Sequence, residues 1–522
     1  MASRRDELNA YTFAKKRTVA AFLQPTPSGT EEGAPRPVRA ALPGVIVGAL
    51  ILAGFGAWGM FKPVAPKGWD DVASHVIVGS DSTTRYVVLK TDGKVQLHPV
   101  LNFASAKLLL EPEKSSTILK VKESELDNGH IPRGPTIGIP YAPDRLPAND
   151  EAKRQKAWAV CEQPGGNGKT TQKAVFVFSE RDPKLKKLRG PQALRGGQAL
   201  YVQGQDGARY VVSPSGTKYL IGGPDWKQKP TADMSLLLRS IFHDGAQPQQ
   251  VTSDWLGTLR DGSPIDFPQV PGSIGGDAGI PSLGEKANRV GMVIEAPSGT
   301  GTQKYVVLRG KVQRVSEFVA KLLMRSKSSI NDASSAVRVK PGSFNPDPDE
   351  FYGTYHWPGE IPEQSNSVDR AAGGSTRDTS CNIFNGVTPK GDPKLTTWAG
   401  TNFPATIPDG ATSAYVTPGS GLLYRQVTGR QVKDGPVFLV TDTGLRYAVP
   451  SNNDSDSGKS KIGGEDKSEK AATAQSQENV NRAQRSLGYE SVKPVPVPAN
   501  WSGFLPTGPR LDYNSARQPQ GS

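Results

Sequence analysis

Cysteine and histidine, the commonest zinc ligands, are scarce in this chain of 522 residues, which has two of the first and five of the second. No histidine lies near a cysteine, and the histidines match no metal-ligand spacing. The chain also lacks Gly-x-Ser-x-Gly, the turn on which an acyl-transfer serine would stand. We therefore predict no metal, no resident cofactor and no catalytic residue. The histidines are His75, His98, His130, His243 and His356.

A complete phosphate-binding loop is also missing. Gly168, Lys169 and Thr170 resemble the end of such a loop, but Gln163 stands where the first glycine is required to wrap the phosphates. The string 457–460, Ser-Gly-Lys-Ser, fails for the same reason. An ordinary hairpin turn is the favoured interpretation of the first loop. An ATP site at Gly168, Lys169 and Thr170 is the alternative.

Long hydrophobic runs are scarce too, and there is one exception. Hydrophobic residues make up 36% of the chain and the mean hydropathy is −0.46, which is typical of a water-soluble bulk. Residues 40–61, however, carry no charge and at about 1.5 Å per residue are long enough to cross a bilayer core of about 30 Å. A cleaved signal peptide is the alternative, but the run is long for one and no small-residue cleavage site follows it. We predict a single transmembrane helix.

Charge and cysteine usage indicate the orientation. The first 39 residues are predominantly basic and include a predicted helix over residues 4–23, which favours a cytoplasmic N-terminus. Cys161 and Cys381 then predict one structural disulfide in an oxidising compartment, with two unrelated buried thiols as the alternative. The net charge of +13 suits anionic neighbours, such as lipid headgroups or a wall polymer. The cations are dispersed, so nucleic acid is not a predicted partner.

The chain repeats itself in the order A, B, A, B. The A motif at Arg85 to Leu89 returns at Lys304 to Leu308, and each copy is followed by Gly-Lys-Val-Gln and an Ala-Lys-Leu-Leu run. The B motif at Trp255 to Asp266 matches Trp501 to Asp512 without a gap. The two cysteines keep nearly the same spacing as the A motifs. Such periodicity indicates an internal duplication, and it would place the disulfide on a pseudo-two-fold axis.

A second B motif pairs Asp206 to Tyr210 with Asp442 to Tyr447. Within it, Asp206-Gly207 predicts a hairpin turn between strands at residues 201–202 and 209–212. We interpret the repeated aromatic and arginine residues as anchors of the repeat cores rather than as a ligand cage. These predicted anchors are Tyr86, Tyr305, Arg209, Tyr210, Arg446, Tyr447, Trp255 and Trp501.

The predicted fold is mainly β with short helices (α+β): one N-terminal transmembrane helix, then an elongated extracytoplasmic region of four repeats in pseudo-two-fold A-B-A-B order around a central β domain. The predicted boundaries are 1–39 for a cytosolic helix and linker, 40–61 for the span, 68–147 for repeat 1, 148–189 for the first half of the central domain, 190–272 for repeat 2, 284–345 for repeat 3, 346–411 for the second half of the central domain, 412–512 for repeat 4 and 513–522 for a disordered tail. Residues 452–478 are predicted to be a mobile loop.

Several strings resemble one family. Val95 to Asn102, Gly138 to Pro147 and Leu505 to Asp512 are similar to motifs of EccB, the single-span core membrane component of type VII (ESX) secretion systems. The resemblance covers essentially the whole chain. It implies a cytosolic N-terminus, one span, four extracytoplasmic repeats around a central β domain, and a disulfide that Cys161 and Cys381 match.

The resemblance also implies function. Members of the family assemble with the motor ATPase EccC and the membrane subunits EccD and, often, EccE, self-associate, and support export of WXG100-type proteins. Some members are credited with ATP hydrolysis, but the incomplete loop at Lys169 departs from that pattern, so we expect the partner motor to supply the energy. We therefore expect a structural secretion subunit. The alternatives are an extracytoplasmic ATPase and a cell-wall-binding anchor module.

Overall fold

The computed structural model describes residues 3–23, 37–61, 65–112, 117–165, 170–299, 301–332, 335–366, 377–407, 413–450, 462 and 482–520. The chain divides into two compact units, and each is described by itself. Unit 1 comprises residues 1–69, 79–82 and 119–130, and unit 2 comprises residues 70–78, 83–118 and 131–522. The names repeat 1 to repeat 4 are kept as labels for the predicted segments.

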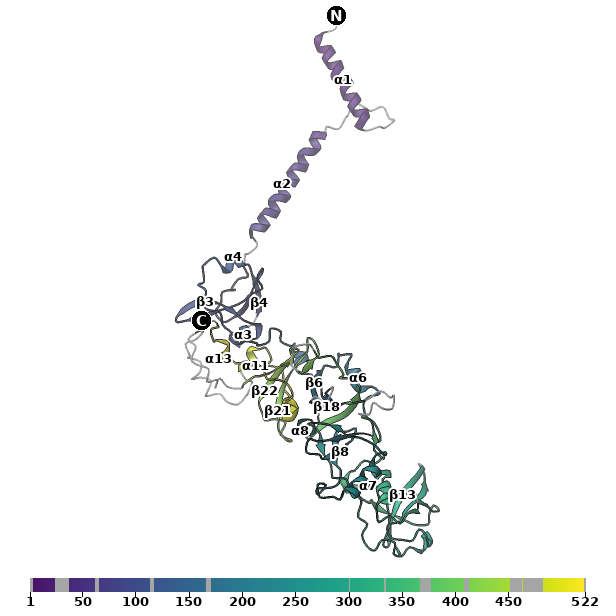
Figure 1. The fold of residues 1–522 in the computed structure, drawn as a ribbon. Helices are drawn as coiled ribbons and strands as arrows, with labels where there is room; N and C mark the ends of the chain where they lie inside the picture. The colour runs from purple at the N-terminus through teal and green to yellow at the C-terminus, as the bar shows by residue number, and fades with distance from the viewer. Residues whose placement is uncertain are drawn as a thin grey trace. The chain divides into compact units, whose positions relative to one another are not determined.

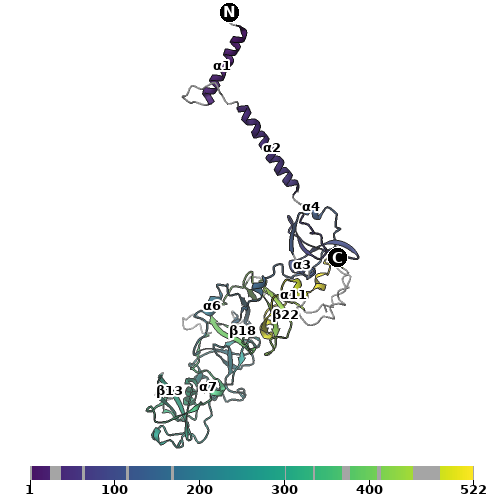
Figure 2. The ribbon, with the colours of Figure 1, turned by 180° about the vertical axis from the view of Figure 1, so that it is seen from behind.

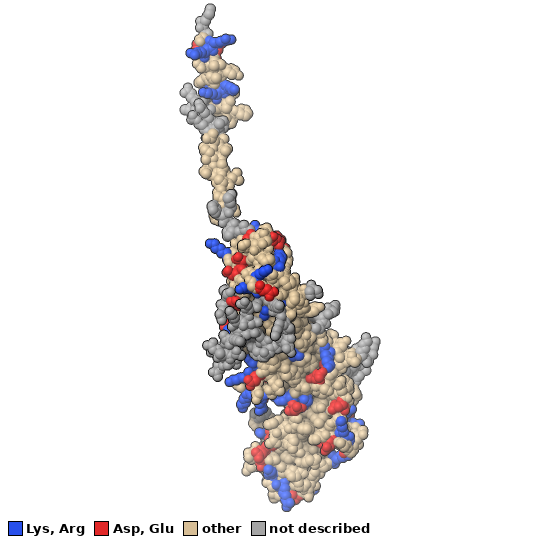
Figure 3. Space-filling model, turned by 90° about the vertical axis from the view of Figure 1, so that its left-hand side faces the viewer, with Lys and Arg blue, Asp and Glu red and all other residues tan. Residues whose placement is uncertain are grey.

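Two long helices dominate unit 1 (Figure 1). Helix α1 covers Arg4–Leu23 and helix α2 covers Pro37–Phe61, so α2 begins three residues before the predicted span. Within α2, Ala41–Gly59 has a mean hydropathy of 1.9 and is long and apolar enough to cross a membrane. Figure 3 shows this stretch as a band without charged side chains. A short helix, α4 (Glu123–Leu126), completes the helices of unit 1 that the structure describes.

Unit 2 is built mainly from small β-sheets. Repeat 1 contains β1 (His75–Gly79), β2 (Arg85–Thr91), β3 (Lys94–Val100) and α3 (Phe103–Leu108), followed by β4 (Thr117–Val121). Repeat 2 contains β7 (Gln198–Gln203), β8 (Arg209–Val212), β9 (Thr217–Leu220), α7 (Thr231–Ile241), β10 (Gln249–Gln250), α8 (Ser253–Gly257) and β11 (Arg260–Asp261). The predicted turn at Asp206 and Gly207 joins β7 to β8 as an antiparallel hairpin, with Gln203 opposite Arg209.

The second half of the chain contributes corresponding elements. Repeat 3 and the residues after it contain η3 (Pro281–Leu283), β12 (Val293–Ser298), β13 (Gly301–Leu308), β14 (Lys311–Arg314), α9 (Glu317–Arg325), β15 (Val337–Arg338), β16 (Pro346–Glu350), η5 (Gly353–Tyr355) and β17 (Glu363–Gln364). Repeat 4 contains β21 (Gly421–Val427), β22 (Val437–Thr441), β23 (Arg446–Ala448), α11 (Arg482–Ser486), β24 (Val495–Pro498) and α12 (Ala499–Ser502).

Repeats 2, 3 and 4 share one topology. In each, three sequential antiparallel strands are followed by a helix and a short strand that returns to pair in parallel with the first strand. The returning pairs are β10 with β7, β15 with β12, and β24 with β21. A parallel return needs a crossover, and the helix between the third and fourth strands supplies it.

A further sheet joins strands from both halves of the chain. Its order is β19-β18-β5-β6-β20, with β5 (Ala157–Gln163), β6 (Gln172–Phe178), β18 (Thr379–Val387), β19 (Pro393–Gly400) and β20 (Ala414–Val416). We call it the central sheet. Residues alternate between its faces, so Trp158 and Val160 pack against repeats 2 and 4, while Ala159 and Cys161 face the other side. Helices α5 (Asn149–Ala152) and α6 (Leu185–Arg189) flank β5 and β6 in the sequence.

The two halves exchange partners around this sheet. One core cluster combines repeat 1 with repeat 4, including Val87, Leu108, Leu423 and Leu439. Another combines repeat 2 with Phe318 and Leu322 of α9 in repeat 3. In both ribbon views α3 of repeat 1 therefore lies beside α11 of repeat 4 (Figures 1 and 2). Each A repeat packs against the B repeat of the other half.

The C-terminal segment corrects one prediction. Tyr513–Ala516 forms helix α13, whose first turn is capped by the Asp512 carboxylate accepting from the Ser515 N–H at 2.9 Å. Ala516 is fully buried in the core shared by repeats 1 and 4, and the Gln520 N–H donates to the Thr136 carbonyl at 2.8 Å. The prediction of a disordered tail is thus wrong for residues 513–520. The predicted mobile loop, 452–478, lies outside the described residues except for Ile462.

Candidate functional site

The tryptophans of the B motif attach repeats 2 and 4 to the central sheet. Trp255 in α8 is completely buried and its Nε1–H donates to the Val160 carbonyl of β5 at 3.1 Å. Trp501 in α12 is also buried and packs against Phe384 of β18, with ring centroids 5.6 Å apart. Both residues lie in the core cluster on one face of the sheet. They anchor two repeats to paired strands.

The two cysteines meet on the opposite face of that sheet. Cys161 and Cys381 form a disulfide, and both are completely buried. They stand directly opposite each other in the antiparallel register of β5 and β18, which puts the bond at the middle of the four strands β19-β18-β5-β6. The bond joins the two halves of the duplication across a separation of 220 residues. A crosslink across so long a loop constrains the unfolded chain strongly.

A lysine from each Ala-Lys-Leu-Leu run joins the exchanged repeats. Lys321 of α9 donates to the carbonyl of Ile241, the last residue of α7, at 3.4 Å, and Lys107 of α3 donates to the carbonyl of Leu487, just after α11, at 3.4 Å. Burial lowers the pKa of both lysines. Cations favour helix C-termini because the last carbonyls have no partner within the helix. The duplicated runs contained this signal, but the sequence did not reveal which carbonyls the lysines reach.

One predicted pair of anchors is out of register. Gly262 and Gly508 occupy matching positions in the B motif, and they lie against the rings of Tyr219 and Tyr447 respectively. The Gly262 N–H donates to the Lys218 carbonyl at 2.9 Å, as the Gly508 N–H donates to the carbonyl just before Tyr447 at 2.8 Å. Lys218 and Tyr219 are therefore the counterparts of Arg446 and Tyr447.

The prediction that paired Arg209 and Tyr210 with Arg446 and Tyr447 is wrong by one strand. The first pair lies in β8, the second strand of its repeat, and the second pair lies in β23, the third strand of its repeat. Similar Gly-containing turns precede both candidates in the sequence, so only the contact with the glycine distinguishes them. The tyrosines of this corrected pair have a shared role. Tyr219 donates its Oη–H to the His356 carbonyl at 3.0 Å, and Tyr447 donates to the Tyr141 carbonyl at 3.3 Å. Both acceptor residues have a left-handed φ, +49° for His356 and +62° for Tyr141.

The remaining anchors lie in ordinary core positions. Tyr86 is buried with the Arg133 guanidinium 4.8 Å from its ring centroid, and Tyr305 packs edge-on against Phe344 at 5.0 Å. Arg209 donates weakly to Gln203, its neighbour across the hairpin, at 3.4 Å.

Arg446 has more partners than Arg209. It donates to Ser502 at 2.8 Å and to Gln426 at 3.1 Å, and its guanidinium lies 5.2 Å from the Phe438 ring centroid.

A buried carboxylate that the sequence did not single out secures α8. Glu162 of β5 is completely buried and accepts hydrogen bonds from the backbone N–H of Thr252, at 2.9 Å, and from its hydroxyl. Thr252 is the N-cap of α8 and accepts in turn from the Trp255 N–H at 3.3 Å. Burial raises the pKa of Glu162, and the hydrogen bonds from Thr252 oppose that rise.

A second buried glutamate behaves in the opposite way. Glu151 of α5 forms an ion pair with the buried Lys156 at 2.8 Å and accepts from the hydroxyls of Ser179, at 2.8 Å, and Ser420, at 2.6 Å. Burial alone would raise its pKa, but these hydrogen bonds outweigh burial and lower the pKa to about 2. The cluster ties the start of β5 to repeat 4.

The predicted nucleotide residues fall between strands β5 and β6 in the sequence. Gly168 and Lys169 are outside the described residues, and Thr170 is exposed. Gln163 ends strand β5 and pairs with Gln172, which begins β6. The loop therefore connects two antiparallel strands. A phosphate-binding loop of the P-loop type leads instead from a strand into a helix.

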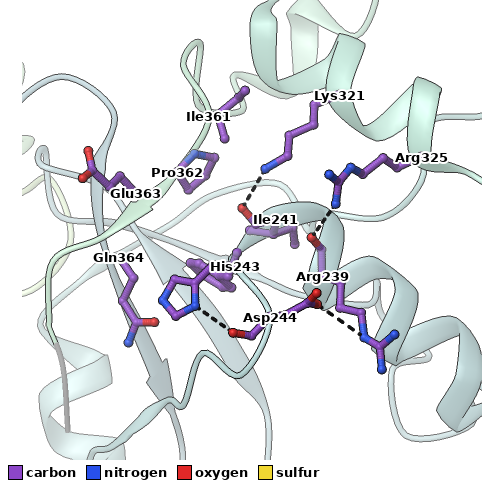
Figure 4. A pocket seen from close by; sticks show the side chains of 11 residues that line it. Arg239, Ile241, His243, Asp244, Lys321, Arg325, Ile361, Pro362, Glu363 and Gln364 are labelled. Carbon is purple, nitrogen blue, oxygen red and sulfur yellow. Dashed lines mark hydrogen bonds and ion pairs between the residues drawn. The ribbon is translucent and has the colours of Figure 1, made fainter. Parts of the chain in front are cut away.

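A surface pocket of about 500 Å³ lies where α7 meets α9 (Figure 4). Most of its charged groups already have partners. Lys321 and Arg325 donate to the carbonyls of Ile241 and Arg239, and Arg239 forms an ion pair with Asp244 at 3.7 Å. The pocket is a by-product of the contact between repeats 2 and 3, and we assign it no ligand. Among the described residues, no group of three or more His, Cys, Asp or Glu is arranged to hold a metal ion.

The sequence model described as "Type VII secretion system ESX-1, transport TM domain B" matches residues 1–521. The chain belongs to this family, the EccB family. It is therefore a type VII secretion component with one candidate membrane helix near its N-terminus.

Individual EccB relatives show intermediate similarity. The Mycobacterium tuberculosis protein named "ESX-2 secretion system ATPase EccB2" is 31% identical over 338 residues, which cover 64% of this chain and 61% of the relative. The chain thus spans about 61% of that relative's length. The "ESX-3 secretion system ATPase EccB3" of the same organism is 26% identical over 512 residues, covering 92% of this chain and 83% of the relative.

Solved EccB-containing structures share the fold. A chain of "an intact ESX-5 inner membrane complex" has a TM-score of 0.53 at 20% identity, covering 100% of this chain and 96% of that chain. A chain of the "EccB3 dimer from the ESX-3 core complex" has a TM-score of 0.56 at 20% identity, covering 85% and 99%. The resemblance to EccB and the mainly β fold class are confirmed.

Proposed function

We propose that the chain is a structural core subunit of a type VII secretion complex. The observation that carries this proposal is the family match over residues 1–521, which includes both the candidate membrane helix and the repeats. Similarity in fold to chains of solved ESX inner membrane complexes supports it. In this proposal the N-terminus is cytoplasmic, α2 spans the membrane, and the repeats act outside it as a brace.

The architecture suits a brace because the repeats of unit 2 complete one another. The core of repeat 1 is filled by side chains of repeat 4, and that of repeat 2 by side chains of α9. Separating either pair would expose apolar surface, at a cost of roughly 25 cal/mol per Å². The disulfide between Cys161 and Cys381 adds a covalent tie between the halves. A frame of this kind can hold partners in position without chemistry of its own.

The proposed partners are the EccC motor, EccD, EccE and a second copy of this chain, with WXG100-type proteins as the exported cargo. One of the similar solved structures is an EccB3 dimer, and another is an inner membrane complex. These two assemblies support self-association and assembly with other subunits. The net charge of +13 supports contact with an anionic wall polymer as an additional role.

ATP hydrolysis is the second candidate, because the relatives are named as ATPases. The strands before and after residues 164–171, β5 and β6, are antiparallel neighbours, which favours the structural role over this one. Turnover by the purified chain that is lost in Lys169→Ala would support hydrolysis at this loop. Turnover that survives the substitution would exclude the loop as its site.

Purification from native membranes in a mild detergent tests the main proposal. We expect the tagged chain to bring down a motor ATPase and a multi-span membrane protein. Recovery of the chain alone, with both candidate partners present in the membrane, would contradict the proposal. Protease added to intact cells tests the orientation: the repeats should be cleaved and an N-terminal tag should be protected.

A further inference from the structure

The two connections that leave strands β6 and β19 of the central sheet differ sharply in charge. Residues 179–195 lead from β6 to Ala193, which bridges to Trp398 of β19. Residues 401–413 lead from β19 to β20, which pairs with β6. We call these the basic connection and the cation-free connection. They are counterparts in the duplication, because Ala193 pairs with β19 at one edge of the sheet as β20 pairs with β6 at the other.

The basic connection carries six exposed cations. These are Arg181, Lys184, Lys186, Lys187, Arg189 and Arg195. The cation-free connection contains no Lys or Arg, and its one charged residue is Asp409. Both connections nonetheless pack apolar side chains into the same core: Leu185 and Leu188 from the first, Phe403 and Ile407 from the second. Both connections thus supply apolar residues to the core, but only the basic connection adds cations. Two of these cations also serve the fold: Arg181 donates to the Gly419 carbonyl at 2.8 Å, and Arg195 donates to the Arg189 carbonyl at 3.1 Å.

Carboxylates offset little of this charge. Asp182 is buried and accepts from the hydroxyls of Tyr415, at 2.9 Å, and Thr417, at 2.7 Å. Glu180 is exposed and pairs with Arg189. On the face drawn in Figure 3, by contrast, Lys and Arg lie among Asp and Glu. The exposed surface of the basic connection is thus locally cationic.

The backbone of α6 is packed against the core, and the Lys184 side chain contacts an aromatic ring. Leu185 and Leu188 bury one side of α6, so Lys184, Lys186 and Lys187 point outward. The Lys187 carbonyl accepts from Trp398 Nε1 at 3.2 Å, and Lys184 Nζ lies 4.4 Å from the Tyr415 ring centroid. A backbone that is already packed loses little freedom when the exposed charged ends bind an anion, which improves binding.

We infer that the basic connection binds an extended anionic polymer whose repeating units carry phosphate groups. The cations follow one another along a surface segment instead of converging on one point, so a chain of regularly spaced charges fits them better than a small anion. Such a polymer gains affinity by releasing its condensed counterions. The inference deepens the proposed wall contact and rests on the proposed location of the repeats outside the membrane.

The test compares two triple variants of the full-length chain in detergent. One is Lys184→Gln, Lys186→Gln and Lys187→Gln in the basic connection. The other is Lys286→Gln, Arg338→Gln and Arg430→Gln, which changes net charge equally at cations paired with Asp332, Glu295 and Asp392. Linear polyphosphate is the polymer probe, and vesicles containing an anionic phospholipid are the lipid probe. Thermal unfolding verifies that both variants are folded.

We expect the first variant to lose about a hundredfold in affinity for polyphosphate at low salt, with the slope of log affinity against log salt reduced by about two. The control variant should stay within about threefold of the parent. Equal losses in both variants would overturn the inference in favour of general net charge. Absence of polyphosphate binding by the parent, or binding to vesicles alone, would also overturn it. Co-purification with secretion subunits is a separate measurement, so the two proposals can fail independently.

Discussion

Helices α8 and α12 carry the same tryptophan motif but are secured differently. Helix α8 begins at a capped end: Thr252 caps it, and the buried carboxylate of Glu162 holds Thr252. Helix α12 follows Pro498, which makes no side-chain cap hydrogen bond. Both tryptophans are nevertheless buried against the central sheet. The shared feature is the burial of the indole, and the cap is a local variation.

The buried tryptophan and the N-cap of these helices contribute differently to stability. Burial of a large aromatic residue contributes several kcal/mol, whereas an N-cap contributes about 1 kcal/mol. A duplicated fold can therefore vary its caps while it keeps its large buried side chains. Pro498 is the last residue of β24, and its side chain has no polar atom with which to cap α12.

Removing a tryptophan should have the largest effect. We expect Trp255→Ala and Trp501→Ala each to lower the free energy of unfolding by about 3–5 kcal/mol, because each leaves a large cavity. Trp255→Phe keeps most of the bulk but loses the hydrogen bond to the Val160 carbonyl. Its free energy of unfolding should therefore lie between those of Trp255→Ala and the parent. Chemical unfolding monitored by circular dichroism measures this. Equal stability of Trp501→Ala and the parent would contradict its role as an anchor.

Removing the disulfide should lower stability by about 2–5 kcal/mol. Because the bond lies between the two halves, the loss in Cys161→Ser with Cys381→Ser should weaken the docking of α8 and α12 alike. Hydrogen exchange of both helices, compared with the parent, is the measurement. Alkylation with and without reductant is the control: two free thiols in the untreated protein would contradict the bond itself.

Adding one methyl group at the B-motif glycines should cost about 1–3 kcal/mol. A Cβ at Gly262 would lie 2.5 Å from the Tyr219 ring, and one at Gly508 would lie 2.6 Å from the Tyr447 ring. Gly257→Ala is the matched control, since a Cβ there meets nothing within 4 Å. Thermal unfolding of Gly262→Ala and Gly508→Ala should therefore show similar losses, and Gly257→Ala little change. A loss of stability in Gly508→Ala alone would contradict the correspondence of Tyr219 with Tyr447.

Lys107→Met and Lys321→Met should each cost about 1–2 kcal/mol, because each leaves a helix-terminal carbonyl without its donor. The two losses should be similar, since both lysines make the same contact between exchanged repeats. Urea unfolding of each variant measures them, with Lys186→Met in α6 as an exposed control. A loss for Lys186→Met as large as for the other two would show a general effect of removing lysine.

The two buried glutamates should give opposite pH dependence. Because the pKa of Glu162 is raised, the folded state binds the carboxyl proton more tightly than the unfolded state does. The contribution of Glu162 to the free energy of unfolding therefore weakens as pH rises above about 4.5. The pKa of Glu151 is about 2, so its contribution is present above about 4.5 and is lost as pH falls towards 2. The unfolding midpoint should therefore depend less on pH than in the parent above pH 4.5 for Glu162→Gln, and below pH 4.5 for Glu151→Gln. Unchanged slopes in both variants would contradict the assignment.

Much of the fold could be predicted because local signals agreed with it. The hairpin at Asp206 and Gly207 formed as expected, since a short polar turn between strand-forming residues has few alternatives. The long apolar run formed α2, and the cysteines with equivalent spacing formed a disulfide. The tail was predicted wrongly because its sequence is mostly polar. Its single buried residue in the core shared by repeats 1 and 4, Ala516, packs against residues that are distant in the sequence.

The site residues divide in the same way. Trp255 and Trp501 stand out in the sequence because the motif repeats without a gap. Tyr219 was missed because Arg209-Tyr210 is identical in sequence to Arg446-Tyr447, whereas Lys218-Tyr219 is not. Only the packing of the ring against Gly262 identifies the true counterpart.

The duplication, the apolar span, the cysteine pair and the family can be identified along the linear chain, because each depends on composition, spacing or local order. The packing of each A repeat on the B repeat of the other half becomes visible in three dimensions, as do the contacts by which Lys107, Lys321 and Glu162 join separate segments. The physical reason is that a repeat exposes the same apolar face whichever partner covers it. The choice of partner is made by the path of the chain through the central sheet, where β5 and β18 pair across the disulfide.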